Sequence, residues 1–447
     1  MLRDDSRSDG TPRSPATPEP RTKAPAGERI RVVVLDGDLL RRVPGATVRI
    51  GSSRLRANRS GIAATRLVPA KFLVSVRAPG YSPAARVFNF RRKSSFILRV
   101  FQPRLQWAMY GADASHTGMH EGVRLRPPFR IAWSLYQGDL IEFPAVVSDG
   151  IAYIANGRGT IRAFSMSDGS LIWLHRTHTI MASSLAVWED KLVAHGMGDG
   201  RVRVLDRDSG RVLWSRRVGS AIESSPAILY GVDYFGTRSG RVYALDLRTN
   251  RVRWAHSTGS KITAGVSVSG RTAYVGNYGG RVTAINTWTG RTRWSRSVNG
   301  RVYGTAPVSD QRLFVPSSTG GSVTAFSTRG THLWTYHTGS YVYSSPATWA
   351  GNVVFGSYNG TLYCVSARTG RLRWKVRLGG AISGAPVIVD GIAYAASFSD
   401  RTVGVDVRSG RAVFSFPHGR YVPVSGNAGR LLLHGYSRIW AVEPRRR

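Results

Sequence analysis

The side chains best suited to binding a partner recur at two positions of a short pattern, G-x-x-[IV]-x, that appears repeatedly between residues 138 and 423. The last position of the pattern holds Glu142, Met181, Glu223, Thr263, Tyr303, Tyr343, Ser383 and Pro423. Two residues earlier the chain has Leu140, Thr179, Ala221, Lys261, Arg301, Tyr341, Ala381 and Tyr421. Carboxylates occupy one part of this series, and tyrosines with cations occupy the other.

Tyrosines beside cations, without a regular pattern, are typical of contacts with a protein or a glycan. Repeats keep their scaffold positions alike and differ where they bind, and these two positions differ most in chemistry. We therefore predict a partner-binding surface, with an ordinary solvated rim as the alternative. Its residues are Glu142, Glu223, Lys261, Arg301, Tyr303, Tyr341, Tyr343 and Tyr421.

Other candidate chemistry is sparse. His116, His120 and Glu121 could hold a metal, but Gly118 lies between the histidines and no helical pattern surrounds them. We expect this segment to form a polar plug instead. The sequence has no Walker-type G-K-[ST], no H-E-x-x-H and no nucleophile elbow. We therefore predict no catalytic residue and no metal site.

The binding positions lie within a long repeat that must place them. Eight aromatic residues follow one another at steps of 40 or 41 residues: Trp133, Trp173, Trp214, Trp254, Trp294, Trp334, Trp374 and Phe414. One unit, residues 223–257, contains four short β-rich runs separated by turn residues. Four strands in about 40 residues is the size of one β-propeller blade. Since a blade cannot bury both of its faces alone, the repeat predicts stacked blades.

Turn residues support this repeat. A glycine or asparagine stands four residues before seven of the aromatics, at Gly169, Gly210, Asn250, Gly290, Gly330, Gly370 and Gly410. These are the residue types that tolerate a positive φ, so we expect a left-handed turn before each fourth strand.

The two ends of the repeat complement each other. No third strand precedes Trp133, and residues 437–444 align with the third strand at 240–247 but have no fourth strand after them. We expect the strand of Trp133 to pair with the segment around Trp440, because closing the ring removes the exposed edges. The sequence therefore predicts an all-β fold, an eight-bladed β-propeller closed by an N-terminal strand and preceded by a small β-sandwich.

The repeat resembles a known family. Ala244, Asp246, Thr249 and Trp254 match the pattern A-x-D-x-x-T-G-x-x-x-W of the pyrroloquinoline-quinone (PQQ)-like, or quinoprotein-type, propellers, with Asn250 in place of glycine. Residues 107–122, WAMYGADASHTGMHEG, resemble the lead-in found before many such propellers. The resemblance implies that the eight aromatics dock neighbouring blades and are structural.

The resemblance leaves two functional classes open. One is a non-catalytic scaffold that binds a protein or an envelope polymer, similar to the propeller subunit of the outer-membrane β-barrel assembly machine. The other is a PQQ-dependent dehydrogenase, in which Glu142 and Glu223 could help to hold Ca²⁺. Those enzymes carry a vicinal cysteine pair, whereas this chain has only Cys364. We therefore expect binding and no cofactor, with PQQ and Ca²⁺ only under the alternative.

The N-terminal part has a different composition. Residues 1–29 are rich in Pro, Ser and charge and are expected to be a disordered leader. Residues 30–101 are β-rich, and 43–50, 59–61 and 67–81 resemble carboxypeptidase regulatory-like (transthyretin-like) domains, with departures at Ser60 and Lys71. The resemblance implies an accessory β-sandwich. We expect a linker and lead-in at 102–130, the propeller at 131–443 and a basic tail at 444–447.

The net charge of +37 suggests a polyanion-binding protein as a further alternative. However, only six of the 63 basic residues are lysine, and the arginines recur in every repeat. We therefore expect no nucleic-acid partner. No apolar run is long enough to cross a membrane and no secretory signal is recognised. The resemblance implies an extracytoplasmic or envelope location, with the cytoplasm as the alternative, and we expect a monomer.

Overall fold

The computed structural model describes residues 27–445, so most of the expected leader and the last two residues of the expected tail lie outside the described residues. No helix within the described range is long and apolar enough to cross a membrane. The described chain divides into two compact units. One holds residues up to Leu35 together with Arg42–Pro79 and Pro83–Arg99, and the other holds Asp36–Arg41, Gly80–Ser82 and the chain from Val100 onward.

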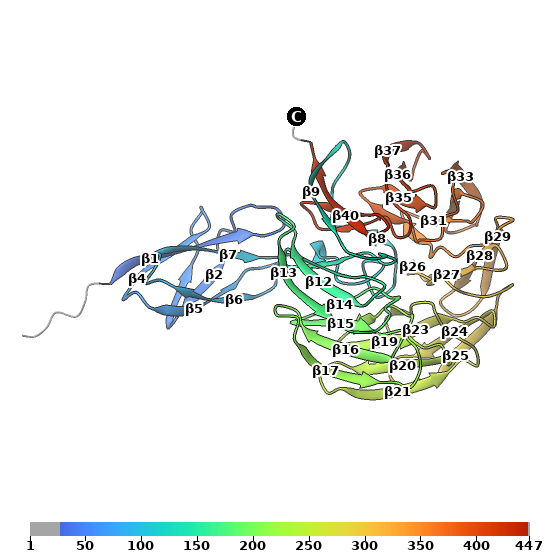
Figure 1. Cartoon of the computed structure of the whole chain (residues 1–447), viewed down its shortest axis with the longest axis horizontal. Coiled ribbons are helices and arrows are strands. Elements are labelled where there is room, and N and C mark those ends of the chain that lie inside the picture. The colour runs from blue at the N-terminus through green and yellow to red at the C-terminus, as the bar shows by residue number, and fades with distance from the viewer. Residues whose placement is uncertain (1–26, 446–447) are drawn as a thin grey trace, which may run out of the picture. The chain divides into compact units, whose positions relative to one another are not determined.

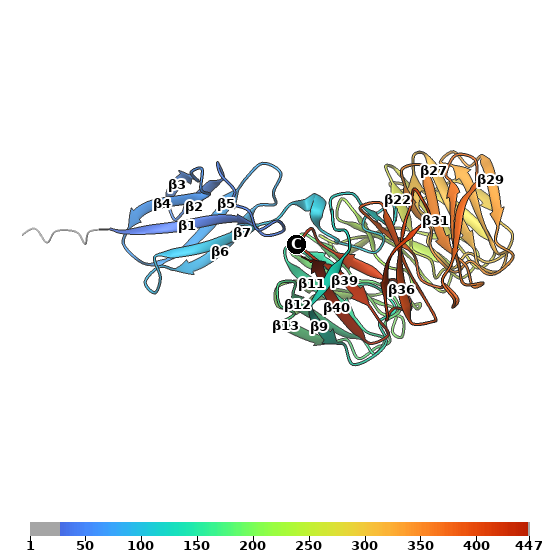
Figure 2. The same cartoon turned by 90° about the horizontal axis from the view of Figure 1, so that it is seen from above.

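The first unit consists of two sheets, with strand orders β4-β1-β7 and β3-β2-β5-β6 (Figure 2). The strands are β1 (Glu28–Asp36), β2 (Thr47–Ile50), β3 (Ser53–Arg56), β4 (Ile62–Leu67), β5 (Lys71–Arg77), β6 (Ala84–Asn89) and β7 (Ser95–Val100). Ile30, Val32 and Val34 are buried at alternate positions of β1, as expected for a strand with one face in a core. Strand β1 begins two residues before the start expected from the sequence.

The second unit begins with the 3₁₀ turn η1 (Pro103–Leu105) and continues as a series of sheets of four consecutive antiparallel strands. The first four sheets contain β10 (Val146–Ser148), β11 (Ile151–Ala155), β12 (Thr160–Ser165) and β13 (Leu171–Arg176); β14 (Ala186–Trp188), β15 (Lys191–His195), β16 (Arg201–Asp206) and β17 (Val212–Arg217); β18 (Ala227–Leu229), β19 (Val232–Gly236), β20 (Arg241–Asp246) and β21 (Arg251–Ser257); β22 (Ser267–Ser269), β23 (Thr272–Gly276), β24 (Arg281–Asn286) and β25 (Thr292–Ser297).

The later sheets continue this order. They contain β26 (Val308–Ser309), β27 (Arg312–Ser317), β28 (Ser322–Ser327) and β29 (His332–His337); β30 (Ala347–Trp349), β31 (Asn352–Gly356), β32 (Thr361–Ser366) and β33 (Leu372–Arg377); β34 (Val387–Val389), β35 (Ile392–Ser397), β36 (Arg401–Asp406) and β37 (Ala412–Phe416), with β8 (Met119–His120) added in parallel to β34; β38 (Val424–Gly426), β39 (Leu431–His434), β40 (Arg438–Pro444) and β9 (Phe129–Tyr136).

These sheets stack as the blades of a β-propeller. All five residues of β19 are buried, whereas the fourth strand of the same sheet, β21, alternates between exposed and covered residues. Inner strands are buried on both sides because a neighbouring sheet covers each face, and only the outer strand meets solvent. Figure 1 shows the sheets following one another in chain order around a common centre, and β10 contacts both β14 and β38.

The last sheet joins the two ends of the repeat. Strand β9 pairs with β40, and Ser134 and Trp133 lie opposite Trp440 and Ala441. The pairing expected for Trp133 is therefore confirmed. The paired strands extend slightly beyond the expected propeller range, because β9 begins at Phe129 and β40 ends at Pro444.

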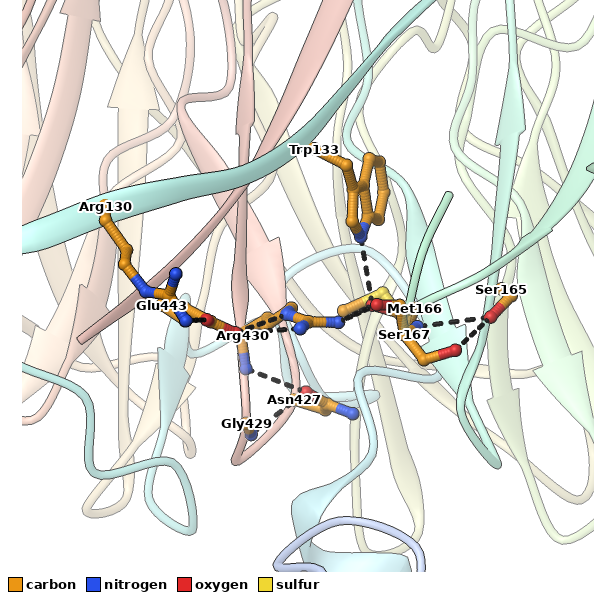
Figure 3. Close-up of polar contacts among 9 residues, drawn as sticks. All are labelled: Arg130, Trp133, Ser165, Met166, Ser167, Asn427, Gly429, Arg430 and Glu443. Carbon is orange, nitrogen blue, oxygen red and sulfur yellow. Dashed lines mark hydrogen bonds and ion pairs between the residues drawn. The ribbon is translucent and has the colours of Figure 1, made fainter. Parts of the chain in front are cut away.

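Ion pairs and hydrogen bonds fix this sheet to the first sheet, β10–β13 (Figure 3). Glu443 of β40 pairs with Arg130 of β9 and, at 2.8 Å, with Arg430. Arg430 Nη1 donates to the carbonyl oxygen of Met166 at 2.7 Å, and the indole of Trp133 donates to the same oxygen at 3.2 Å. One carbonyl after β12 therefore receives hydrogen bonds from Trp133 of β9 and from Arg430, which directly precedes β39.

The repeat tryptophans bridge neighbouring sheets. Six of them donate the indole N–H to a carbonyl of the next sheet: Trp133 to Met166, Trp173 to Arg207, Trp254 to Thr287, Trp294 to Thr328, Trp334 to Ala367 and Trp374 to Val407, at 2.8–3.2 Å. Each ring also lies against the turn glycine of that next sheet. A Cβ added to Gly290, for example, would come 2.8 Å from Trp254.

The expected left-handed turns are confirmed, since φ is positive at all seven positions, from +53° at Asn250 to +87° at Gly330. Asn250 is the one turn residue with a Cβ, and it faces Trp214. Among the repeat tryptophans in the described range, Trp214 is the one whose indole donates to no carbonyl of the next sheet. Instead, Arg216 Nε donates to Asn250 Oδ1 at 2.8 Å. The seam at Trp214 therefore differs from the others both in its turn residue and in the side chain that bonds to it.

The lead-in segment crosses the centre of the propeller. Its backbone bonds the first strands of six sheets at equivalent positions of the repeat: Trp107 with Val147, Ala108 with Val187, Ala114 with Val268, Ser115 with Val308, Thr117 with Thr348 and Gly118 with Ile388, at 2.6–2.9 Å. The His116 ring is buried, with Nδ1 2.8 Å from the Tyr110 carbonyl and Nε2 3.2 Å from that of Val266. As expected from the sequence, the segment is a plug.

Candidate functional site

The connections between sheets and the turns between second and third strands lie at the same edge of each sheet, because successive strands are antiparallel. Backbone hydrogen bonds of 2.7–2.9 Å join each turn between a second and a third strand to the connection that leads into the same sheet. The N–H groups of Gly157, Met197, Arg238, Tyr278, Ser318, Tyr358 and Phe398 donate to the carbonyls of Leu140, Ile180, Ala221, Lys261, Arg301, Tyr341 and Ala381, respectively. Two series of loop residues therefore surround the central channel.

A cavity of about 70 Å³ opens at this channel mouth. Five of the eight residues predicted to bind a partner line it: Glu142, Glu223, Tyr303, Tyr343 and Tyr421. The sequence series thus converges on one space, although its members come from sheets far apart in the chain. We call this space the mouth cavity.

The other three predicted residues, Lys261, Arg301 and Tyr341, are not among the residues that line the mouth cavity. The Lys261 ammonium lies 4.6 Å and the Arg301 guanidinium 5.7 Å from the centroid of the Tyr278 ring. The Tyr341 side chain is half exposed beside Tyr343, with ring centroids 6.0 Å apart. These three residues form the rim of the cavity.

One wall of the mouth cavity is acidic. Glu223 forms an ion pair of 3.1 Å with Arg238, whose side chain is about half exposed. Burial raises the pKa of the Glu142 carboxyl, and the negative charge of Glu223 raises it further. No ion pair or side-chain hydrogen bond to Glu142 occurs within residues 27–445. Glu142 is therefore a carboxyl group that the described protein leaves uncompensated.

A continuous series of aromatic rings runs around the opposite side of the mouth, and three of them, Tyr303, Tyr343 and Tyr421, line the cavity as its tyrosine wall. Tyr278 and Tyr303 have centroids 6.3 Å apart, Tyr303 and Tyr343 5.2 Å, and Tyr343 and Tyr358 4.7 Å. The series continues from Tyr358 to Phe398 at 6.1 Å and from Phe398 to Tyr421 at 5.6 Å. Burial raises the pKa of Tyr303, and the charges of Glu142 and Glu223 add to this, so the phenol is neutral. The wall offers ring faces and hydroxyl groups.

The floor is formed by the plug and its neighbours. Tyr110 is buried, its hydroxyl lies 3.3 Å from Ser345 Oγ, and burial raises its pKa to about 12. The Tyr110 ring stands edge to face with Phe143 at 5.7 Å. Beside them, the hydroxyl of Thr263 is buried and has no hydrogen-bond partner in the described part of the chain. The floor therefore offers one unused polar atom.

Comparison with known families identifies the repeat. Residues 130–261, 238–348 and 320–437 match the family described as outer membrane protein assembly factor BamB. These matches together span most of the chain. The chain belongs to the BamB family. No curated protein sequence matches it.

Solved structures share the fold of this BamB-family chain. BamB from Moraxella catarrhalis is 18% identical with a TM-score of 0.61, over 71% of this chain and 98% of its own. The quinohemoprotein alcohol dehydrogenase from Comamonas testosteroni is 13% identical with a TM-score of 0.65. The match covers 77% of this chain and 81% of the dehydrogenase. A europium-containing methanol dehydrogenase is 14% identical with a TM-score of 0.63. The match covers 74% of this chain and 88% of that enzyme. At these identities the likeness shows the β-propeller fold alone.

Sequence reasoning missed part of this BamB-family site. Tyr278, Tyr358, Phe398 and Arg238 lie in the turns between second and third strands. A signal was available, because the residues at this turn position, such as Met197, Arg238, Tyr278 and Tyr358, also differ in chemistry from repeat to repeat. Tyr110 and Phe143 carried no such signal, since the path of the plug cannot be read from the repeat.

The groups considered for metal or quinone chemistry lie elsewhere or do not fit. His120 Nε2 lies 2.9 Å from the Gln106 carbonyl, and no group of three His, Cys, Asp or Glu side chains within residues 27–445 is placed to hold a metal ion. Cys364 is buried in β32, and burial raises its thiol pKa to about 12. In the mouth cavity, Glu223 is already paired with Arg238.

Proposed function

We propose that this chain is a non-catalytic scaffold that binds a protein partner through the mouth cavity and its rim. The observation that carries the proposal is the convergence of Glu142, Glu223, Tyr303, Tyr343 and Tyr421, the positions at which the repeats differ, on a single space. Tyrosines packed in a partly desolvated cavity are the side chains that contribute most to protein interfaces. The family description, outer membrane protein assembly factor, supports a protein partner in the cell envelope.

The finer architecture supports this role. We propose that the sheets from β10 to β40 form one closed ring of eight blades, in which β9 completes the last blade. We further propose that the first unit is a carboxypeptidase regulatory-like sandwich that acts as an accessory domain, and that the protein acts as a monomer. A closed ring holds the loops of distant blades at fixed positions, so the cavity is formed before a partner arrives.

We propose that the scaffold works without a cofactor. Titration with PQQ and Ca²⁺ is expected to give no tight complex and no alcohol oxidation. A tight complex, or alcohol oxidation that depends on added PQQ, would instead support a quinoprotein dehydrogenase.

The binding proposal is tested by affinity capture from the native envelope fraction. The wild type is compared with the double variant Tyr303→Ala, Tyr343→Ala and with Tyr230→Ala. Tyr230 is the matched control, since its ring is 83% exposed and lies in the turn between β18 and β19 at the opposite edge of the sheet. We expect the wild type and the control to capture the same set of proteins. The double variant should no longer capture that set. An unchanged set would contradict the proposal.

A further inference from the structure

We propose that the mouth cavity receives one basic side chain of the partner, a lysine ammonium or an arginine guanidinium, between the acidic wall and the tyrosine wall. This inference deepens the proposed function and rests on it to the extent that the ligand belongs to a protein. It specifies the chemistry of the group that enters the cavity, which neither the fold nor the family description supplies.

The charge of the mouth cavity favours a cation. Glu142 and Glu223 both line the cavity, and the described chain provides one cation for them, Arg238, which contacts Glu223 at 3.1 Å. Glu142 therefore lacks a counter-charge. A carboxylate taken from water is stabilised by a paired cation that also donates hydrogen bonds. A basic side chain meets both needs, whereas a carboxylate or phosphate ligand would be repelled.

The tyrosine wall opposite the carboxylates also favours a cation. Ring faces attract cations, and the attraction strengthens where water is excluded. Tyr303 and Tyr343 present this surface inside the cavity, with centroids 5.2 Å apart. The rim already uses the same pairing, because Lys261 Nζ lies 4.6 Å from the centroid of the Tyr278 ring. The cavity offers a similar environment, and the partner supplies the cation.

The hydrogen-bond acceptors of the cavity suit a basic side chain. An ammonium group has three donors. The cavity offers acceptors at Glu142, at Glu223 and at the buried hydroxyl of Thr263, which has no partner among the described residues. An unsatisfied buried hydroxyl is costly, so a ligand that bonds to it gains affinity. A neutral aliphatic side chain of the same length would leave Glu142 and the Thr263 hydroxyl without a partner, since Glu223 is the only one of the three that the described chain already pairs.

The rim restricts what flanks the basic residue. Lys261 and Arg301 lie over Tyr278, and Arg420 lies 5.3 Å from the Phe398 ring centroid. Together with the net charge of +37, these cations repel a polybasic chain. The expected ligand is therefore a single lysine or arginine flanked by neutral or acidic residues.

The test is a calorimetric titration of the full chain with capped peptides. The probe has one lysine flanked by glycines and aspartates, and its counterparts carry arginine, norleucine or glutamate in place of that lysine. We expect the lysine and arginine peptides to bind and the other two to bind at least about tenfold more weakly. Glu142→Gln should weaken lysine-peptide binding by about tenfold or more, and the control Glu189→Gln, an exposed carboxylate paired with Arg248, should not change it.

Several results would overturn the inference. These are equal binding of the norleucine and lysine peptides, no binding of the lysine peptide, or no effect of Glu142→Gln. Binding of a neutral oligosaccharide such as cellotriose that is lost in Tyr303→Ala would assign the cavity to glycans instead. The two proposals can fail separately. If Tyr343 cross-links a protein in cells equally well in Glu142→Gln, the proposed function stands and this inference fails.

Discussion

The rings of Tyr303 and Tyr343 stand edge to face, with centroids 5.2 Å apart and planes at 76°, although a whole repeat separates them in the chain. Equivalent positions of successive blades lie side by side around a propeller channel, so a one-residue change per repeat can build a continuous surface. In this chain the scaffold positions repeat and the mouth positions do not. The proposed binding chemistry is therefore concentrated where the fold tolerates variation.

Glu142→Gln is expected to leave the thermal midpoint at neutral pH unchanged or to raise it. Because burial raises the pKa of Glu142 in the folded protein, the folded state binds its proton more tightly than the unfolded state, and stability falls as pH rises through that raised pKa. The neutral amide removes this penalty. A differential scanning calorimetry trace with a clearly lower midpoint would mean that Glu142 serves the fold and not a ligand.

Trp254→Ala should destabilise the protein by about 3–5 kcal/mol, because it removes a buried ring from the seam between sheets and leaves a cavity. Trp254→Phe should cost less, about 1 kcal/mol, since the loss is mainly the 2.8 Å hydrogen bond to the Thr287 carbonyl. Trp214→Ala is the internal comparison and should cost less than Trp254→Ala. Urea unfolding measures all three, and equal losses at Trp214 and Trp254 would contradict this account of the seam.

The unfolding free energy should decrease as pH falls from about 6.5 to about 4. Burial lowers the pKa of His116 and of His434 from 6.5 to about 4, so in this window the unfolded chain binds protons that the folded state does not. His434 Nε2 accepts the Ala145 N–H at 3.1 Å, and protonation would abolish that bond. Each histidine contributes up to about 3 kcal/mol across the window.

His434→Gln should make the pH dependence shallower by up to one proton, while the exposed His178→Gln should behave like the wild type. Chemical unfolding across the pH range measures this slope. An unchanged slope in His434→Gln would show that His434 titrates normally in the folded protein.

The closure of the ring is tested by a cross-link. Tyr136 and Arg438 are opposite each other in the pairing of β9 with β40. We expect Tyr136→Cys combined with Arg438→Cys to form an intramolecular disulfide without loss of structure and to raise the unfolding midpoint in the absence of reductant. Each single variant should unfold like the wild type. Absence of the cross-link would place the two strands apart and remove the eight-bladed ring.

The fold could be predicted because it follows from a repeat in the sequence. The period of the aromatics, the positive-φ turns such as Gly290 and the pairing of the strand of Trp133 with the segment around Trp440 all follow from spacing. Trp214 departs from the shared tryptophan contact at the one repeat whose turn residue, Asn250, is not glycine, and that exception was visible in the sequence. The path of the plug was not predictable, since His116 and its neighbours depend on contacts with sheets far along the chain.

The site could be predicted only in part. The last position of the sequence pattern faces the channel at Glu142, Glu223 and Tyr343, but Lys261 and Tyr341, two residues earlier in the pattern, stand on the rim. The connecting segments are not strands, so the two-residue alternation that assigns faces in a sheet does not apply to them. For the same reason, the turn residues that extend the aromatic series could be recognised only in the folded structure.

The central claim is that a partner protein binds at the mouth cavity, and site-specific photo-cross-linking in the native organism tests it most directly. A photoreactive amino acid is placed at Tyr343 in one strain and at Tyr230, on the opposite edge of the propeller, in another. We predict one defined protein adduct from Tyr343 that is lost when Tyr303 is also changed to alanine, and none from Tyr230. An adduct from Tyr230 with none from Tyr343 would contradict the account.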